Sequence, residues 1–240
     1  FARMPERPQQ PRIASAGFMD SSTPSNALKL LADGMYMVAQ TLYYVADPMC
    51  SWCWGFAPTL ELVASRLLHE TQLQLVLGGL AADSDEPMDE ATKTYLQQAW
   101  RSVSEATGAT FNFAFWEQCA PRRSTWPACR AVLAAGELGR QMFAAIQRAY
   151  YLEARNPSDT STLIELAAEL GIDIPTFTER LASNTTHKLL TEHFELRDRL
   201  AAQGFPTLLL ERDGEVVPIA RGFARFEALE ATLRKHNAIL

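Results

Sequence analysis

The spacing of hydrophobic positions in the first part of the chain predicts a strand, a helix and a second strand. The β-prone apolar run TLYYVA occupies residues 41–46, and residues 72–79 alternate between polar and apolar until two glycines end the run. Between them, Leu60, Val63 and Leu67 recur with the spacing of one helical face. Such a helix is long enough to cross over between parallel strands, so we expect both strands in one parallel sheet.

The apolar spacing becomes helical over residues 86–203. The clearest helix places Leu163, Leu166 and Leu170 on one face, and Gly171 provides a C-terminal stop. A segment of this length is large enough to pack as a unit of its own. We therefore expect a helical insertion domain at these residues.

Strand spacing returns after the helical segment. Two apolar runs flank Asp213 and Gly214, a pair favoured in two-residue hairpin turns. Pro218 predicts that the second run forms an edge strand, because proline lacks a backbone N–H group. Apolar side chains then repeat with helical spacing over residues 226–233. The pattern as a whole predicts the α/β fold class.

These elements predict how the chain is divided. Residues 41–85 and 204–240 together form the expected α/β domain, and residues 86–203 form the insertion between its two parts. Residues 1–40 are expected to be a disordered tail, because their first part is rich in Pro, Ser and Gln and shows no sustained period.

The composition narrows the functional classes. The chain has 240 residues, 48% of them hydrophobic, and a formal net charge of -6. A chain of this size buries a substantial core, and its acidic balance argues against a nucleic-acid or anionic-membrane binder. The local basic cluster of Arg122, Arg123 and Arg130 could contact an anion, although an ordinary solvated surface is the simpler interpretation.

The expected compartment is the cytoplasm. No apolar run approaches the roughly 18 residues of a membrane span, and the N-terminus lacks the order of a secretory signal. Because residue 1 is Phe, the true start of the chain, a removed leader and a periplasmic location stay open. Four cysteines are too few for a disulfide scaffold, and a close pair in a cytosolic protein is more often catalytic or metal-binding.

Such a pair, Cys50 and Cys53, lies where the first strand gives way to the first helix. Residues three apart share one helical face, so a disulfide between them can open and close without backbone movement. Unpaired N–H groups and the helix dipole favour a thiolate at Cys50. We therefore predict that Cys50 is the attacking thiol and that Cys53 resolves the mixed disulfide.

Two other interpretations of this pair are weaker. Two buried structural thiols would be an unusual way to fill a core at a helix start. A zinc site would need two more ligands, and none of the four histidines forms a second close pair. Cys119 and Cys129 are ten residues apart, which is not a usual ligand spacing. We therefore expect no metal site.

Several segments together carry a resemblance to a known family. The segments DPMCSWCWGFAP at 47–58, STWPACRAVLAAGELG at 124–139 and GFPTLLL at 204–210, with the helical insertion, resemble the DsbA-like branch of the thioredoxin superfamily. Within it they look like the cytosolic-type disulfide isomerases. The resemblance covers about residues 41–240 and implies a thioredoxin-like fold with a large helical insertion.

The resemblance also implies an activity and a set of site residues. The protein would be a thiol-disulfide oxidoreductase or isomerase whose electrons reside in Cys50 and Cys53, so no bound cofactor is expected. Pro206 would be a cis-proline facing the cysteines, and the backbone of Phe205 would pair with the substrate. The expected partners are protein or small-molecule thiols and disulfides, with glutathione as a candidate co-substrate and neither nucleic acid nor membrane.

Other residues near the motif have a functional and an ordinary interpretation. Trp52 and Trp54 could form an apolar surface for substrates, although packing is the more ordinary role for Trp54. Asp47 could relay a proton to Cys53, although Asp-Pro before a helix is first of all a turn. Cys129 heads an apolar helix and is most simply a small buried hydrophobe, and whether it pairs with Cys119 stays open.

Two rival functions share parts of this pattern. Kappa-type glutathione transferases and chromene-carboxylate isomerases have a similar inserted domain but typically carry a serine at the place of Cys50, so the presence of both cysteines argues against them. A redox-sensing or metal-binding protein would have the cysteines without catalysis. The substrate, the direction of electron flow and the oligomeric state stay open.

Overall fold

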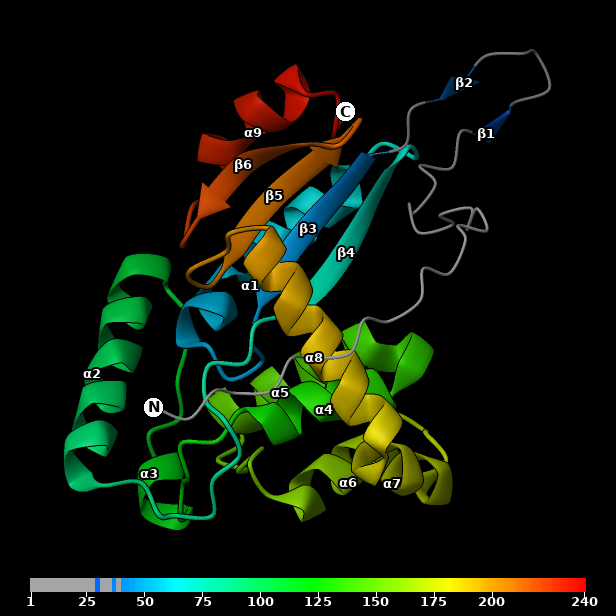
Figure 1. Ribbon diagram of the computed structural model, residues 1–240. Helices are drawn as coiled ribbons and strands as arrows, with labels where there is room; N and C mark the ends of the chain where they lie inside the picture. Colours follow the sequence, from blue (N-terminus) through cyan, green and yellow to red (C-terminus); the bar gives the residue numbers. More distant parts are fainter. Residues whose placement is uncertain (1–28, 31–35, 38–39) are drawn as a thin grey trace, which may run out of the picture.

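The computed structural model describes residues 29–30, 36–37 and 40–240 (Figure 1). Most of the expected N-terminal tail therefore lies outside the described residues. The described part of this segment contains two short strands, β1 (Lys29–Leu30) and β2 (Tyr36–Met37), which pair in an antiparallel ladder.

The central sheet has four strands in the order β4-β3-β5-β6. Strand β3 (Gln40–Ala46) is parallel to β4 (Thr71–Leu77), and α1 (Ser51–Arg66) connects them. Strand β5 (Thr207–Arg212) is antiparallel both to β3 and to β6 (Glu215–Arg221). The expected strand-helix-strand unit is confirmed, and its first strand begins one residue earlier than the sequence predicts.

The predicted hairpin between β5 and β6 is also confirmed. Asp213 and Gly214 have φ angles of 54° and 80°, the left-handed backbone that a two-residue hairpin turn requires. Pro218 lies opposite Leu209 on the outer strand β6, where the register of the ladder shifts. The missing N–H group of Pro218 is tolerated on this strand because β6 has a neighbour on one side only.

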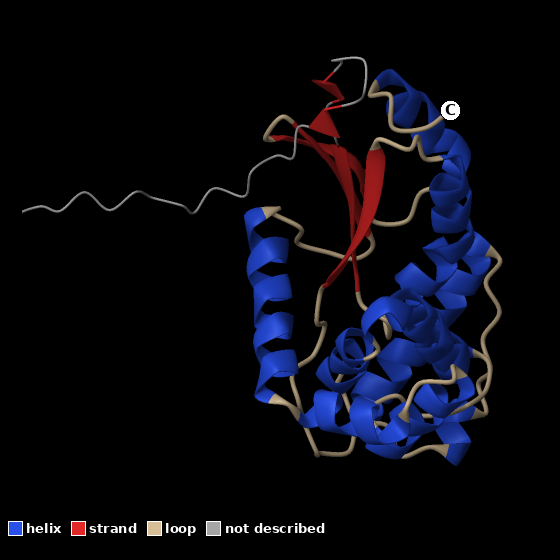
Figure 2. Cartoon of the chain, turned by 90° about the vertical axis from the view of Figure 1, so that its right-hand side faces the viewer, coloured by secondary structure: helices blue, strands red, loops and turns tan. Residues whose placement is uncertain are grey.

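The helices between β4 and β5 cover much of the predicted insertion (Figures 1 and 2). They are α2 (Glu90–Thr107), α3 (Phe115–Gln118), α4 (Trp126–Ala134), the 3₁₀ turn Gly136–Leu138, α5 (Gly139–Tyr151), α6 (Thr160–Glu169), α7 (Ile174–Ala182) and α8 (Asn184–Arg199). The final helix, α9 (Phe226–Lys235), follows the hairpin. In Figure 1, α2 stands apart at the left from the group formed by α4 to α8.

One hydrophobic core runs through the sheet and most of the helices. Leu42 of β3 and Phe56 of α1 belong to the same buried cluster as Ile146 of α5 and Leu163 of α6. The helical segment therefore shares a hydrophobic core with the sheet. Helix α2 reaches α1 at Gly55, where an added β-carbon would lie 2.8 Å from the side chain of Thr107.

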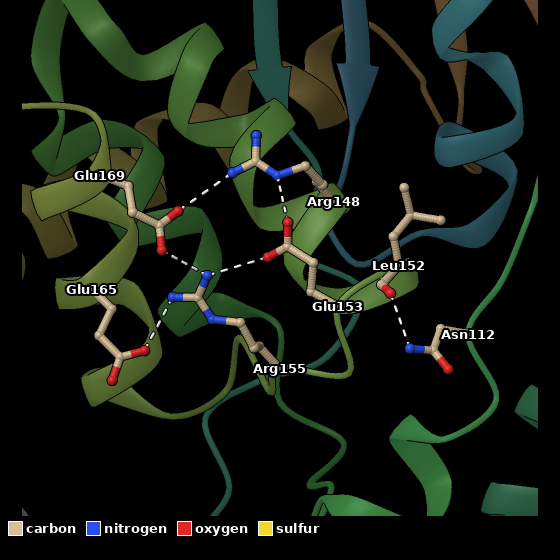
Figure 3. A network of polar contacts seen from close by, with 7 residues as sticks. All are labelled: Asn112, Arg148, Leu152, Glu153, Arg155, Glu165 and Glu169. Carbon is tan, nitrogen blue, oxygen red and sulfur yellow. Dashed lines mark hydrogen bonds and ion pairs between the residues drawn. The ribbon is translucent and has the colours of Figure 1, made fainter.

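Charged side chains tie the end of α5 to α6 on the outside of the helical group (Figure 3). Arg148 contacts Glu153 at 2.7 Å and Glu169 at 3.4 Å. Arg155 contacts Glu153 at 3.2 Å, Glu169 at 2.8 Å and Glu165 at 3.0 Å. Isolated exposed ion pairs contribute little to stability, but several charges joined in a network contribute more, so this network helps to connect the turn after α5 to α6.

Candidate active site

Cys50 and Cys53 occupy the first turn of α1, as the sequence predicts. Cys50 is the N-cap residue, with extended backbone, and its Sγ accepts a hydrogen bond from the Cys53 N–H at 3.4 Å. Cys50 is 7% exposed and Cys53 is completely buried. Of the two thiols, Cys50 is therefore the one that a substrate in the solvent reaches first.

The loop before β5 meets Cys50 from the opposite side. The Phe205–Pro206 peptide bond is cis, as expected, and the Cys50 thiol lies 3.7 Å from the carbonyl oxygen of Phe205, to which it donates. The ring of Phe205 lies over Gly78, where an added β-carbon would come within 2.1 Å of the ring. The glycine that ends β4 in the sequence therefore also leaves room for Phe205 beside Cys50.

Asp47 is completely buried, and its carboxylate is surrounded by donors. Its Oδ1 accepts from the Met49 N–H at 2.8 Å. Its Oδ2 accepts from the Leu80 N–H at 2.8 Å, from the Thr125 hydroxyl at 2.7 Å and from the Cys129 thiol at 3.6 Å. The Asp47 side chain thus joins the start of α1 to the loop after β4 and to α4.

Burial and hydrogen bonding act in opposite directions on Asp47. Burial raises the pKa of Asp47, whereas the donors from Leu80, Thr125, Met49 and Cys129 stabilise its charged form. Because burial is the larger effect, this carboxyl group holds its proton to a higher pH than an ordinary aspartate does.

The buried thiol next to this carboxyl group is shifted in the same direction. Burial raises the pKa of Cys53 well above its ordinary value, and Cys50 raises it further, while the Asp47 backbone N–H opposes the shift. The Asp47 charge adds to the increase. Cys53 therefore needs a nearby proton acceptor to become a nucleophile.

Tyr44 is a neighbour of the cysteines that the sequence analysis did not single out. It is 3% exposed on β3, and burial raises its pKa well above the ordinary value, with further contributions from Cys53 and Cys50. Its hydroxyl is therefore a neutral donor beside the buried thiol. A tyrosine in the middle of an apolar strand carries no local signal that would separate it from an ordinary core residue.

Cys50 lines a cavity of about 210 Å³ between the start of α1, helix α2 and the segment that precedes α4. Trp52 lines it too, and its ring lies 6.2 Å from that of Phe223. The remaining walls combine apolar side chains with two arginines: Met49, Ser51, Leu80, Ala81, Met88, Tyr95, Leu96, Ala99, Trp100, Arg122, Arg123, Thr125, Tyr150 and Phe205. Trp52 therefore lies in the wall of the cavity at Cys50.

Trp54 has a different environment from Trp52. Its indole N–H donates to the Thr110 carbonyl oxygen at 3.0 Å, and its ring stacks on Tyr151 at 5.7 Å. It packs against the aromatic cluster that Trp100, Phe115, Tyr150 and Tyr151 form. These contacts match the packing role, the more ordinary of its two interpretations.

Cys119 and Cys129 are free thiols with different partners. The Cys119 thiol donates to the Ala154 carbonyl oxygen at 3.0 Å, and burial raises the pKa of Cys119. Cys129 is completely buried in the hydrophobic core, as expected, and its thiol also donates a weak hydrogen bond to Asp47 at 3.6 Å. The local sequence could not show this contact, because 82 residues separate Cys129 from Asp47.

Among the residues that the structure describes, no group of three or more His, Cys, Asp or Glu side chains is placed to hold a metal ion. None of the helices described is long and apolar enough to cross a bilayer.

Comparison with known sequences gives matches over most of the chain. A model of the DSBA-like thioredoxin domain matches residues 41–234. The ClpXP adapter protein SpxH of Bacillus subtilis is 24% identical over 199 residues, which are 78% of this chain and 65% of that protein. The SpxH protein of Halalkalibacterium halodurans is 21% identical over 180 residues, or 72% and 58% of the two chains. The chain therefore spans less than two thirds of the length of these curated relatives.

Two similar solved structures are more identical to the chain than the SpxH proteins are. A Nitrosomonas europaea protein assigned as a disulfide isomerase is 31% identical with a TM-score of 0.74, covering 82% of this chain and 97% of that one. The cytosolic disulfide reductase DsbM of Pseudomonas aeruginosa is 29% identical with a TM-score of 0.68, covering 82% and 98%. A 2-hydroxychromene-2-carboxylate isomerase, 15% identical with a TM-score of 0.58, shares the fold alone. The chain therefore belongs to the DSBA-like thioredoxin domain family, and its fold is the thioredoxin-like fold with a helical insertion that the motifs predict.

Proposed function

We propose that the protein is a thiol-disulfide oxidoreductase that exchanges disulfides through Cys50 and Cys53. The observation that carries the proposal is the position of the Cys50 thiol. It accepts the Cys53 N–H from within α1 and faces the Phe205 carbonyl oxygen across the cis-proline loop. An attacking sulfur, a resolving sulfur and backbone groups for a substrate thus occur within one site.

The exchange takes two steps. The Cys50 thiolate attacks one sulfur of a substrate disulfide, the substrate S–S bond breaks, and the first substrate thiolate leaves and takes up a proton from water. The Cys53 thiolate then attacks the Cys50 sulfur, which releases the second substrate thiolate. Two electrons have passed from the protein dithiol to the substrate, and the protein holds a Cys50–Cys53 disulfide. The reverse sequence would oxidise a dithiol.

Asp47 accepts the proton of Cys53 in the second step. Because burial raises the pKa of Cys53, its thiol is a poor nucleophile without a base. Asp47 is the buried carboxyl group whose charge acts on Cys53, and Thr125 and Leu80 hold its Oδ2 by donated hydrogen bonds. We assign to Pro206 and the Phe205 backbone the alignment of the substrate sulfur with Cys50.

The substrates we propose are small-molecule or protein disulfides, with glutathione as the returning thiol. DsbM, a cytosolic disulfide reductase, has also been solved with GSH and is 27% identical to this chain in that form. Trp52 replaces the histidine that stabilises the thiolate in strong oxidants, which favours reduction or isomerisation in the cytoplasm. We further propose that residues 41–85 with 204–240 carry the chemistry and that 86–203 act as a lid.

The test is turnover of a disulfide by the reduced protein and two cysteine variants. Cys50→Ser should abolish reduction of bis(2-hydroxyethyl) disulfide. Cys53→Ala should accumulate a mixed disulfide on Cys50, detected by mass spectrometry of the intact chain. Cys119→Ser is the matched control, because the Cys119 thiol donates its hydrogen bond to Ala154 and not to Cys50 or Cys53. A mixed disulfide trapped in Cys50→Ser instead would reverse the two roles.

The same assay separates the rival functions. A redox sensor or adapter would form the Cys50–Cys53 disulfide once and would not turn over with excess thiol. An isomerase of the chromene-carboxylate type would not turn over the disulfide in this assay, because its reaction does not oxidise the cysteine pair.

A further inference from the structure

The cavity at Cys50 differs in charge from the chain as a whole. The chain carries a net charge of -6, yet the described residues that line the cavity include two arginines and neither Asp nor Glu. These arginines, Arg122 and Arg123, belong to the basic cluster that the sequence analysis interprets most simply as an ordinary solvated surface. The third member of that cluster, Arg130, makes a bidentate pair with Asp83 at 2.8 Å.

The two arginines of the cavity are not equivalent. Arg122 pairs with Asp159 at 2.7 Å through its Nη2, which also donates to the Ser158 carbonyl oxygen, so its charge is largely offset. Arg123 is exposed and belongs to no ion pair within the part of the chain that the structure describes. Arg123 is therefore the cation of this cavity whose charge is available to a ligand.

The backbone on both sides of Arg123 is fixed by hydrogen bonds. On one side, the Pro121 carbonyl oxygen accepts from the Met88 N–H at 2.9 Å. On the other, the Ser124 carbonyl oxygen accepts from the Ser158 hydroxyl at 2.7 Å. A cation held in this way loses little conformational freedom at its backbone when a ligand binds.

A second observation places the Arg123 charge at the cavity wall. Tyr150 also lines the cavity, and burial raises its pKa while the Arg123 charge opposes that increase. The guanidinium group is therefore close enough to act on a group in the wall. Met88, Tyr95 and Leu96 line the same cavity and supply an apolar surface from α2 and the segment before it.

We propose that Arg123 binds a carboxylate of the substrate, so that the cavity selects small anionic thiols and disulfides. This inference rests on the proposed function and names its substrate class. The guanidinium fork matches the geometry of a carboxylate, and charge-assisted hydrogen bonds of this kind are about twice as strong as neutral ones. A ligand would place its sulfur at Cys50, its aliphatic stem along the apolar wall and its carboxylate at Arg123.

The test compares three small disulfides that differ mainly in charge. Reduced full-length protein is mixed with 3,3′-dithiodipropionate, bis(2-hydroxyethyl) disulfide or cystamine, and the second-order rate of protein oxidation is measured by tryptophan fluorescence. Glutathione disulfide forms a fourth arm. In Arg123→Gln, the ratio of the anionic to the neutral rate should fall about tenfold, which corresponds to about 1.4 kcal/mol. In Arg123→Lys the ratio should fall less, and in Arg123→Glu cystamine should become the preferred substrate.

A matched control separates local recognition from overall charge. Arg140→Gln removes the same charge from an exposed arginine that does not line this cavity, so the ratio should stay at the wild-type value. A ratio that is unchanged in Arg123→Gln, or that falls equally in Arg140→Gln, would overturn the inference. Turnover of the neutral disulfide by the wild type would still support the proposed function in that case, and its absence would refute the function itself.

Discussion

Replacing Thr125 with valine tests the proposed proton transfer through Asp47. Thr125→Val keeps the shape of the side chain but removes the hydroxyl that donates to Asp47 Oδ2 at 2.7 Å and accepts from the Ala81 N–H at 3.1 Å. A hydrogen bond to a charged group contributes about 1.5–3 kcal/mol. Its loss destabilises the carboxylate, so the pKa of Asp47 rises further in the direction in which burial already shifts it.

The expected consequence is a slower resolving step. When a larger fraction of Asp47 is protonated at a given pH, less carboxylate is available to accept the proton of Cys53. Each increase of about 1.4 kcal/mol in the activation free energy slows a step tenfold. We therefore expect the release of the second thiol to slow by about tenfold or more near neutral pH. The pH at which this step reaches half its maximal rate should move upward. The attack by Cys50 should change less, because Thr125 donates to Asp47 and not to Cys50.

Ellman's reagent resolves the two steps. In a Cys119→Ser background, stopped-flow mixing should release one coloured thiolate as Cys50 attacks and a second as Cys53 resolves the mixed disulfide. Thr125→Ser keeps the hydroxyl and should restore the second phase. Cys129→Ala should have a smaller effect, because a thiol at 3.6 Å is a weak donor. Wild-type pH dependence of the second phase in Thr125→Val, or equal behaviour of the serine and valine variants, would refute the role of Asp47.

The same variant changes how stability depends on pH. A carboxyl group whose pKa is raised by folding contributes stability below its unfolded pKa, and that contribution is lost as the pH rises through the folded pKa. Thr125→Val raises the pKa of Asp47 in the folded state further. As the pH rises and Asp47 ionises, the variant should therefore lose more unfolding free energy than the wild type does. Urea unfolding should show a larger gap between the two proteins at about pH 8 than at about pH 5.

Three other changes test separate parts of the site. Trp52→His should raise the reduction potential by tens of millivolts, since about 30 mV corresponds to about 1.4 kcal/mol of thiolate stabilisation; a glutathione redox titration giving an unchanged or lower potential would contradict this. Gly78→Ala should displace the Phe205 ring and slow formation of the mixed disulfide, whereas Gly204→Ala, with no atom within 4 Å of its added β-carbon, should not. His193 accepts a hydrogen bond from the Leu77 N–H at the end of β4 at 3.0 Å, and burial lowers the pKa of His193 below 6.5. The contribution of this neutral imidazole to stability is therefore present above about pH 6.5 and is lost as the pH falls through the pKa of His193 in the folded state. The unfolding free energy of the wild type relative to His193→Gln should therefore fall between about pH 7.5 and about pH 5, and an equal pH dependence of the two proteins would exclude this effect.

The sequence by itself determined those features that depend on neighbouring residues. Periodicity identified the strand-helix-strand unit, because side chains that face one core repeat at the period of their own element. Asp213 and Gly214 specified the hairpin, and the spacing of Cys50 and Cys53 placed two thiols together at the start of α1. The order of residues along the chain is enough to predict these features, because each of them is formed by residues that are near one another in the sequence.

The tertiary structure alone decided which distant residues complete the site. Thr125 reaches Asp47 across 78 residues, and Cys129 reaches the same carboxylate across 82. Arg123 becomes part of the cavity for the same reason, because the loop that carries it is held beside α1 by contacts from other segments. Local periodicity carries no information on such pairs, because they depend on how the sheet and the helical segment pack around one core.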